Sequence, residues 1–357
     1  MKFSNRAAEQ LSLDSRITGL IVRTLEDGLS RFRGRAVRVR DVDREFSRSS
    51  STFHTERLRV FLDRDKKPLR IFFKDLHPGH QVTDARALHR LNRTSSRREL
   101  DMYRSILSRE HFGTLRLYAS RWEPARGRCW LFLEHAGRTP LNDVLDLGEW
   151  TNAARWAARF HAATRGVPAG QTKFLPRWDR GHYRRRAEQV ERLLPTVDLR
   201  ERELLRGGLD ALYARLDWLS ALPRCVIHGQ FFGKNIMLRP RGTRPRIAVI
   251  DWETAVLGPR AFDLASICTG WSSDERGAMQ VAYVEEYQAA TGEAMGWDDF
   301  CLEVRTVGIY QALEWLVWWG PHRSLPRRLR RFQRFLRELE VLLEERRPAR
   351  AAARAVG

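Results

Sequence analysis

Two short apolar stretches, each followed by side chains that can bind a metal, constrain the fold of this chain most strongly. Residues 225–227 lead into the segment 228–235 (HGQFFGKN), and residues 247–250 lead into Asp251. Both stretches predict buried strands that hold Asn235 and Asp251 rigidly. One amide oxygen and one carboxylate suffice for Mg²⁺, which keeps several ligands from phosphate or water. The alternative is that both residues cap strand ends in turns, but the preceding His228-Gly229 pair favours the metal.

The first third of the chain predicts a small antiparallel sheet with two helices. A helix is expected over 14–32, where Ile17, Ile21, Leu25 and Leu29 form one stripe. Alternating or strongly apolar segments separated by turn residues predict the strands, and Leu100, Tyr103 and Leu107 mark the buried face of a second helix. The strands are expected over 36–46, 57–62, 69–76, 115–120 and 129–134, and the second helix over 95–107.

A change of pattern between Ala136 and Pro140 marks the expected boundary between two domains. From Glu149 onward the chain is mostly helical apart from residues 224–251, and its last helix is expected over 325–346. We therefore expect a strand-rich domain over 1–135 and a helical domain over 136–347. The Ala- and Arg-rich tail over 348–357 is expected to be disordered.

Lys74 lies on the expected strand 69–76 among apolar neighbours, where a buried cation needs a partner. Glu99, on the helix that follows, is the expected partner, and Asp101 is its competitor. Two alternatives remain open. Lys74 could face solvent from an edge strand, and Glu99 could instead close a capping box with Ser96.

Several residues of the second half have either a structural or a functional interpretation. Asp263, near the start of a helix, is expected to accept backbone amides of the loop 228–230 and to brace it. Tyr310, Trp315, Trp318 and Trp319 have helical spacing and are interpreted as core, with an acceptor pocket as the alternative. His161 is interpreted as structural.

Together these residues resemble the aminoglycoside phosphotransferase/choline kinase superfamily, a branch of the protein-kinase-like fold. The resemblance runs in order from about residue 36 to 270. Its matching elements are Lys74, Glu99, Leu133-Glu134, the helix from Ala157 to Ala162, His228-Gly229 with Asn235, Asp251-Trp252-Glu253, and Gly258-Pro259 with Asp263-Leu264-Ala265. It implies an α+β, two-lobed fold with a small antiparallel-sheet N-terminal lobe and a larger helical C-terminal lobe.

The resemblance also implies ATP or GTP, Mg²⁺ and transfer of a γ-phosphoryl group to a hydroxyl of a small molecule or a peptide. The implied metal ligands are Asn235 and Asp251. The implied nucleotide-binding residues are Lys74, Glu99, Glu134 at a hinge, and Ser49, Ser50 and Ser51 in a loop over the phosphates, which could equally be a solvated loop. The implied catalytic residues are His228, Gln230, Asn235, Asp251 and Glu253.

Gln230 departs from the family pattern, which places an aspartate there to orient the acceptor hydroxyl and take its proton. A glutamine amide cannot take up a proton at physiological pH. Phosphoryl transfer depends mostly on positioning and charge stabilisation, so a slow enzyme with Gln230 as an orienting group is one expectation. Glu253 is then the first candidate for a surrogate base. The alternative is a nucleotide-binding pseudokinase that acts as a scaffold or regulator.

The net charge of +20 comes almost entirely from arginine, a bias typical of a GC-rich bacterial genome. Such charge favours anionic partners, and a third hypothesis is that the surface binds nucleic acid or an anionic membrane. The charge is scattered, which disfavours that hypothesis. The sequence shows no transmembrane run and no export signal, so a cytoplasmic protein is expected. The four widely spaced cysteines are expected to be buried, reduced thiols.

Overall fold

The structure is a computed structural model that describes residues 15–47, 53–80, 96–108, 112–137, 139–240, 246–320 and 326–344. The chain divides into two compact units. We call Met1–Arg138 with Leu238–Glu253 the sheet unit, and Thr139–Met237 with Thr254–Gly357 the helical unit. Residues 238–253 belong to the sheet unit, although they follow much of the helical unit in sequence. The expected domain ranges placed these residues in the helical domain.

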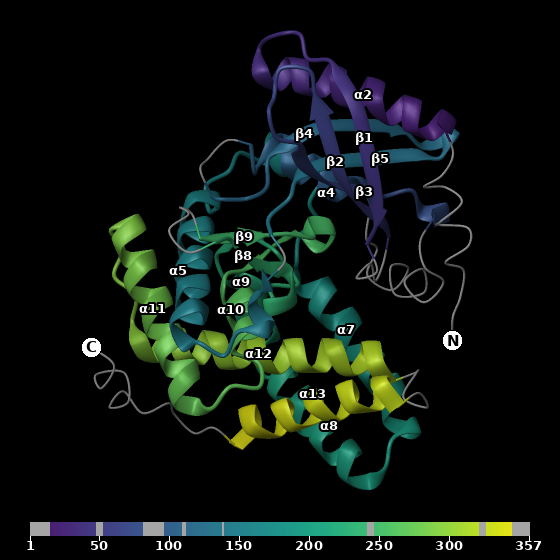
Figure 1. The fold of residues 1–357 in the computed structure, drawn as a ribbon. Coiled ribbons are helices and arrows are strands. Elements are labelled where there is room, and N and C mark those ends of the chain that lie inside the picture. Colours follow the sequence, from purple (N-terminus) through teal and green to yellow (C-terminus); the bar gives the residue numbers. More distant parts are fainter. Residues whose placement is uncertain are drawn as a thin grey trace. The chain divides into compact units, whose positions relative to one another are not determined.

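The sheet unit is built on a five-stranded sheet in which every neighbouring pair is antiparallel (Figure 1). The sheet confirms the expected strands, with ends that differ by a few residues. In spatial order its strands are β1 (Val39–Phe46), β2 (His54–Leu62), β3 (Leu69–Asp75), β5 (Arg128–Glu134) and β4 (Leu117–Glu123). β3 therefore has a partner on both sides, and Lys74 does not lie on an edge strand.

Helix α2 (Ser15–Arg33) covers one face of this sheet, as its stripe of apolar residues predicts (Figure 1). Ile21, Leu25 and Leu29 are fully buried in one core with sheet residues such as Ile71 and Phe73. Because side chains alternate along a strand, Lys74 points to the opposite face from Phe73. Helix α4 (Ser96–Ser105) and strand β9 (Ile247–Val249) complete this unit.

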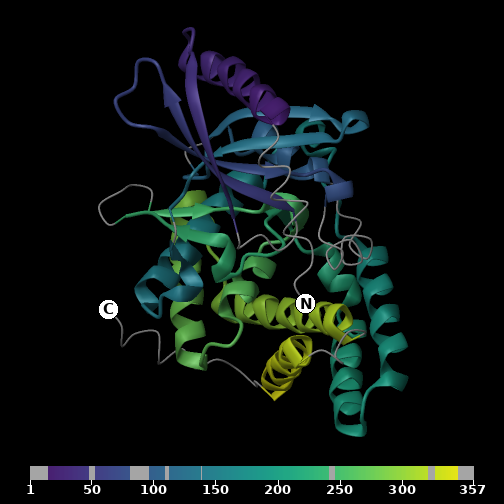
Figure 2. The ribbon, with the colours of Figure 1, turned by 45° about the vertical axis from the view of Figure 1, so that its right-hand side comes forward.

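The helical unit contains nine helices among its described residues. In chain order they are α5 (Leu147–Thr164), α6 (Ala169–Thr172), α7 (Arg180–Leu193), α8 (Leu199–Tyr213), α9 (Leu216–Ala221), α10 (Ala261–Cys268), α11 (Ser273–Thr291), α12 (Trp297–Trp319) and α13 (Pro326–Glu344). Figures 1 and 2 show α12 and α13 side by side near the C-terminal end of the fold. The last helix confirms the expected one.

Short strands of the helical unit position the segment that begins at His228 and the helix that contains Asp263. β7 (Arg224–Ile227) ends at the residue before His228 and pairs antiparallel with β10 (Val256–Pro259). β10 leads into α10, whose first turn contains Asp263. The remaining strands are β6 (Thr139–Pro140) and β8 (Ile236–Leu238), the latter running to the boundary with the sheet unit.

The aromatic residues of α12 mostly support the core interpretation. Tyr310 is fully buried and Trp315 is buried, with its ring stacked 5.6 Å from that of Phe335 on α13. Trp318 and Trp319 are half-buried. The core interpretation is therefore confirmed for Tyr310 and Trp315.

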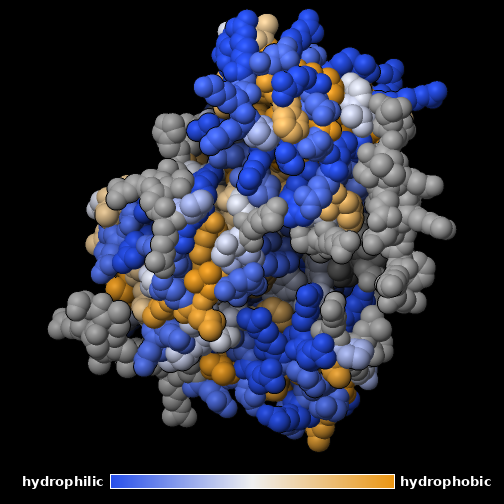
Figure 3. Space-filling model, viewed as in Figure 1, coloured by the Kyte–Doolittle hydropathy of each residue, from blue (hydrophilic) through white to orange (hydrophobic). Residues whose placement is uncertain are grey.

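The surface seen in Figure 3 is largely hydrophilic, with small scattered apolar patches. None of the helices in the described part of the chain combines the length and the apolar character needed to cross a membrane. All four cysteines are buried and none forms a disulfide, which confirms the expectation of buried thiols.

Candidate active site

A buried lysine held by two carboxylates is the centre of the candidate site in the sheet unit. Lys74, only 5% exposed, donates a 2.7 Å hydrogen bond to Glu99 Oε2 and contacts Asp251 Oδ1. β3 supplies Lys74, α4 supplies Glu99, and the turn after β9 supplies Asp251. The sequence therefore placed the Lys74–Glu99 ion pair correctly. Asp101, the competing residue, bonds Arg97 on its own helix instead.

A third carboxylate joins this cluster. One oxygen from each of Glu99, Asp251 and Glu253 lies within 4.8 Å of the others. Carboxylate oxygens are the ligands that Mg²⁺ prefers, so the donor set of this cluster fits a divalent cation. Asp251 and Glu253 belong to the sequence motif, whereas Glu99 reaches them only through the fold.

The backbone at Asp251 is in the left-handed region, with φ of 72°. Residues other than glycine adopt this conformation rarely, although aspartate tolerates it better than most. Conformations of this kind concentrate at functional sites, where the surrounding structure holds them. The turn thus directs the Asp251 carboxylate toward Lys74 at a local cost in energy.

The charges of the cluster control its protonation. Burial by itself lowers the pKa of the Lys74 ammonium, but Asp251, Glu99 and Glu253 outweigh this effect and hold that pKa well above its ordinary value. Burial raises the pKa of the Glu99 carboxyl, and the ammonium of Lys74 opposes that rise. Lys74 is therefore a permanent cation among three acidic groups.

Arg98 is a second buried cation beside the cluster, and the sequence analysis missed it. Its Nη1 donates a 3.2 Å hydrogen bond to the backbone oxygen of Glu253. Burial lowers the pKa of its guanidinium to about 10, against the opposing effect of Glu253. The sequence offered only one indication of this role, which is that Arg98 directly precedes Glu99. Arginine is common in this chain, and Arg98 lies far from Glu253 in sequence, so neither residue pointed to the other.

In the helical unit, Asp263 braces the loop that carries Gln230. Its Oδ2 accepts the backbone N–H of His228 at 2.6 Å, and its Oδ1 accepts that of Gly229 at 3.0 Å. His161 Nε2 lies 3.2 Å from Asp263 Oδ2, and His161 Nδ1 lies 2.8 Å from the Tyr283 hydroxyl. All of these side chains are buried. The brace expected of Asp263 and the structural role expected of His161 are both confirmed.

The loop also requires glycine at position 229. Gly229 has φ of 78°, and a Cβ there would lie 2.5 Å from the backbone oxygen of Thr254. The Thr254 hydroxyl donates to the backbone oxygen of His228 at 3.0 Å. His228 is fully buried, and its Nδ1 accepts the backbone N–H of Gln230 at 3.2 Å. The backbone around Gln230 is thus fixed from several sides.

Gln230 itself is half-buried, and its side chain makes no hydrogen bond to the described residues. Asn235 is buried, and its Nδ2 donates to the backbone oxygen of Gln230 at 3.0 Å. This bond turns the Asn235 amide so that its nitrogen faces the loop and leaves its oxygen as the available ligand atom. Gln230, His228 and Asn235 therefore lie together in the helical unit, whereas Lys74, Glu99, Asp251 and Glu253 lie together in the sheet unit.

The remaining residues expected to contact the nucleotide are Glu134 and the serines of the segment 49–51. Glu134 ends β5, where its backbone N–H bonds the oxygen of Arg116 and its side chain lies 3.4 Å from Arg239. Ser49, Ser50 and Ser51 lie outside the described residues.

Comparison with known proteins assigns the family. A model of the phosphotransferase enzyme family (APH) matches residues 59–297, which is more than half of the chain. The chain therefore belongs to this family of phosphotransferases. A search of curated proteins returned no match.

Solved structures with similar folds agree with this assignment. Choline kinase from Cryptosporidium parvum Iowa II is 12% identical, with 92% of this chain and 96% of that chain covered and a TM-score of 0.59. A choline/ethanolamine kinase family protein from Mesorhizobium loti is 13% identical, with 99% of both chains covered and a TM-score of 0.57. The GDP complex of wild-type aminoglycoside 2'-phosphotransferase-IIIa is 12% identical, with 91% and 98% covered and a TM-score of 0.56.

These identities are low, so the structural likeness concerns the fold. It confirms an α+β protein-kinase-like fold with an antiparallel-sheet part and a helical part. With the family match, the protein is a kinase-like phosphotransferase.

Proposed function

We propose that this phosphotransferase binds ATP or GTP with Mg²⁺ and moves the γ-phosphoryl group to a hydroxyl of a small molecule or a peptide. The observation that carries the proposal is the buried ammonium of Lys74 between Glu99 and Asp251. A buried lysine paired with a helix glutamate is the arrangement that kinase-like sites use to hold nucleotide phosphates. The similarity in fold to a GDP-bound phosphotransferase supports nucleotide binding.

Each residue of the two clusters has a role in this proposal. Lys74 contacts the phosphates, and Glu99 orients its ammonium. Asp251 and Asn235 serve as the protein ligands of Mg²⁺, as the spacing of the sequence motif indicates. The metal, when bound, neutralises charge on the phosphate oxygens. Glu134 and the segment with Ser49, Ser50 and Ser51 supply the remaining nucleotide contacts.

The loop 228–235 positions the acceptor. Gln230 has a side chain without a bond to the described residues, so its amide oxygen is available to accept from the acceptor hydroxyl. The amide orients that hydroxyl without taking its proton. Glu253, buried beside Asp251, is the candidate for the missing base. His228, also buried, positions the backbone of Gln230.

A nucleotide-binding pseudokinase is the second candidate, and Gln230 is the observation that favours it. General-base assistance contributes about 10²–10⁴-fold to rate, and Gln230 cannot supply it. In that case the same Lys74 cluster binds nucleotide but no acceptor is phosphorylated. The two candidates therefore share nucleotide binding and differ in turnover.

Lys74→Met tests the proposed function. We expect at least about a 10²–10³-fold loss of Mg²⁺-dependent phosphoryl transfer from ATP or GTP, the range seen when one preorganised electrostatic donor is removed. The measurement is transfer of a labelled γ-phosphoryl group to a panel of hydroxyl-bearing acceptors. Thermal unfolding of the variant shows whether it remains folded.

Lys66→Met is the matched control, because Lys66 is exposed in the turn before β3 of the same unit. We expect it to transfer phosphoryl groups at the wild-type rate. Full activity in a folded Lys74→Met protein would contradict the proposed site. Nucleotide binding by the wild type without transfer to any acceptor would favour the pseudokinase.

A further inference from the structure

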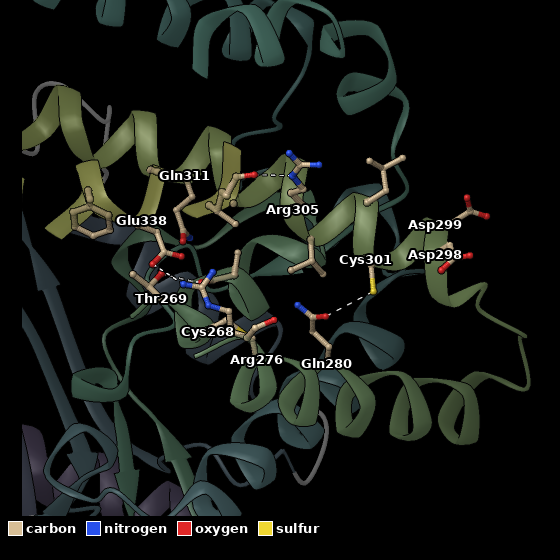
Figure 4. A pocket seen from close by; sticks show the side chains of 18 residues that line it. Cys268, Thr269, Arg276, Gln280, Asp298, Asp299, Cys301, Arg305, Gln311 and Glu338 are labelled. Atoms are coloured by element: carbon tan, nitrogen blue, oxygen red, sulfur yellow. Dashed lines mark hydrogen bonds and ion pairs between the residues drawn. The ribbon is translucent and has the colours of Figure 1, made fainter. Parts of the chain in front are cut away.

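A cavity of about 320 Å³ lies within the helical unit among α10, α11, α12 and α13 (Figure 4). None of its lining residues belongs to the clusters around Lys74 or Gln230. Its volume is at the lower end of the range of ~300–1,000 Å³ that is usual for small-molecule sites. The proposed function therefore leaves this cavity unexplained.

The walls of the cavity combine apolar side chains with a few buried polar ones. Val304, Ala312, Phe335 and Leu342 are among the apolar residues that line it. The polar residues Thr269, Arg276, Gln280, Gln311 and Glu338 are each at most 8% exposed. Ligand sites typically have such a composition, in which a mostly apolar surface carries a small number of polar groups that fix orientation.

Gln311 presents a hydrogen-bond acceptor to the cavity. Its Nε2 donates to the backbone oxygen of Phe262 at 3.1 Å and lies 2.6 Å from the Ser266 hydroxyl. A backbone oxygen can only accept, so this bond fixes which end of the amide is the nitrogen. Oε1 of Gln311 has no partner among the described residues.

Gln280 presents the complementary donor. Figure 4 shows its side chain reaching from α11 toward Cys301 on α12, whose Sγ lies 3.8 Å from Gln280 Oε1. Nε2 of Gln280 has no partner within the described part of the chain. Because the Gln280 side chain is only 8% exposed, a ligand or a water molecule in the cavity is the partner that this N–H would bond.

The buried ionic groups of the cavity form one closed pair. Arg276 Nη2 lies 2.9 Å from Glu338 Oε2, and Glu338 also accepts the backbone N–H of Gly270 at 3.0 Å. Figure 4 shows this pair near Thr269 and Cys268, on the opposite side of the lining residues from Asp298 and Asp299. The other charged residues that line the cavity are Arg305, which donates to the backbone oxygens of Leu342 and Leu343, and the exposed Asp298 and Asp299. Burying a charged ligand without a countercharge is unfavourable, so the buried part of the wall, where Arg276 and Glu338 are already paired, favours a neutral molecule.

We propose that this cavity is a second small-molecule site, which binds a neutral compound with an apolar body and one group that both donates and accepts hydrogen bonds, such as a primary amide. The ligand accepts from Gln280 Nε2 and donates to Gln311 Oε1, while its apolar part lies against Val304, Phe335 and Leu342. The site is separate from the residues assigned to phosphoryl transfer, and its existence does not depend on that activity.

Calorimetric titration of the full-length protein with benzamide tests the proposal. We expect saturable binding of benzamide, and weaker or no binding of its charged analogues benzoate and benzylammonium. Gln280→Leu removes the donor and should weaken benzamide binding roughly fivefold, the effect of one neutral hydrogen bond. Gln288→Leu, on the same helix but outside the cavity lining, is the matched control and should bind as the wild type does.

A cavity-filling variant and a crystal structure complete the test. Ala312→Leu occupies part of the cavity and should abolish benzamide binding without lowering the melting temperature. A crystal soaked with benzamide should show the compound between Gln280 and Gln311. Absence of saturable binding, equal binding to Gln280→Leu, or density for water alone in the soaked crystal would each overturn the proposal in favour of a hydrated void.

Discussion

Gln230→Asp should raise the rate of phosphoryl transfer by about 10²–10⁴-fold, the usual contribution of a general base. The loop around position 230 is fixed by Asp263, His228 and Asn235 through its backbone, and none of these bonds involves the Gln230 side chain. The substitution therefore leaves the loop intact and replaces an amide oxygen by a carboxylate that can take the acceptor proton. Steady-state transfer with the wild type's best acceptor measures the gain.

Gln230→Asn distinguishes the effect of adding a general base from the effect of shortening the side chain. Asparagine has the length of aspartate but no proton-accepting group, so this variant should show no gain. Equal rates in the wild type and Gln230→Asp would show that another group, Glu253 being the first candidate, already supplies the base. Equal gains in both variants would contradict the account, because shortening alone would then explain the effect.

Asp263→Ala should lower the free energy of unfolding by about 2–5 kcal/mol, because each buried polar group left without its partner costs about 1–3 kcal/mol. The alanine leaves the backbone N–H groups of His228 and Gly229 without their acceptor, and it leaves His161 without its carboxylate. The Asp263 side chain is almost fully buried, so water cannot replace these bonds readily. Urea denaturation of the wild type and the variant measures the loss.

Asp274→Ala is the control for this substitution. Asp274 is exposed in the first turn of α11, so its removal should cost less than about 1 kcal/mol. We further expect the loss of the brace to reduce phosphoryl transfer, because the backbone that positions Gln230 is no longer held. An Asp263→Ala protein as stable as Asp274→Ala would contradict the structural role of the brace.

The sequence was sufficient for the parts of the site that short-range patterns determine. The spacing of apolar residues was enough to predict the strands before His228 and Asp251 and the strand that carries Lys74 among apolar neighbours. Asp263 follows Gly258-Pro259 at the start of a helix, which was enough to predict its bonds to the 228–230 loop. The five-stranded antiparallel sheet was predicted for the same reason.

The remaining features depend on packing between distant segments, which a single sequence does not reveal. Arg98 and Glu253 meet only because α4 and the turn after β9 lie together in the sheet unit. The positive φ of Asp251 is only weakly indicated by the residue type, because aspartate tolerates this conformation but adopts it rarely. The cavity beside Gln280 and Gln311 arises from the fit of four helices, none of which carries a motif for a ligand.

Thermal unfolding with ATP and GTP, each with and without Mg²⁺, is the most direct test of the account's central claim. The comparison is between the wild type and Asp251→Ala, with Asp143→Ala on the exposed surface as control. The account predicts a Mg²⁺-dependent rise in melting temperature for the wild type and the control, as expected when a ligand binds the folded state, and its loss in Asp251→Ala. An equal rise in Asp251→Ala, or no rise in the wild type with either nucleotide, would contradict a magnesium–nucleotide site at Asp251.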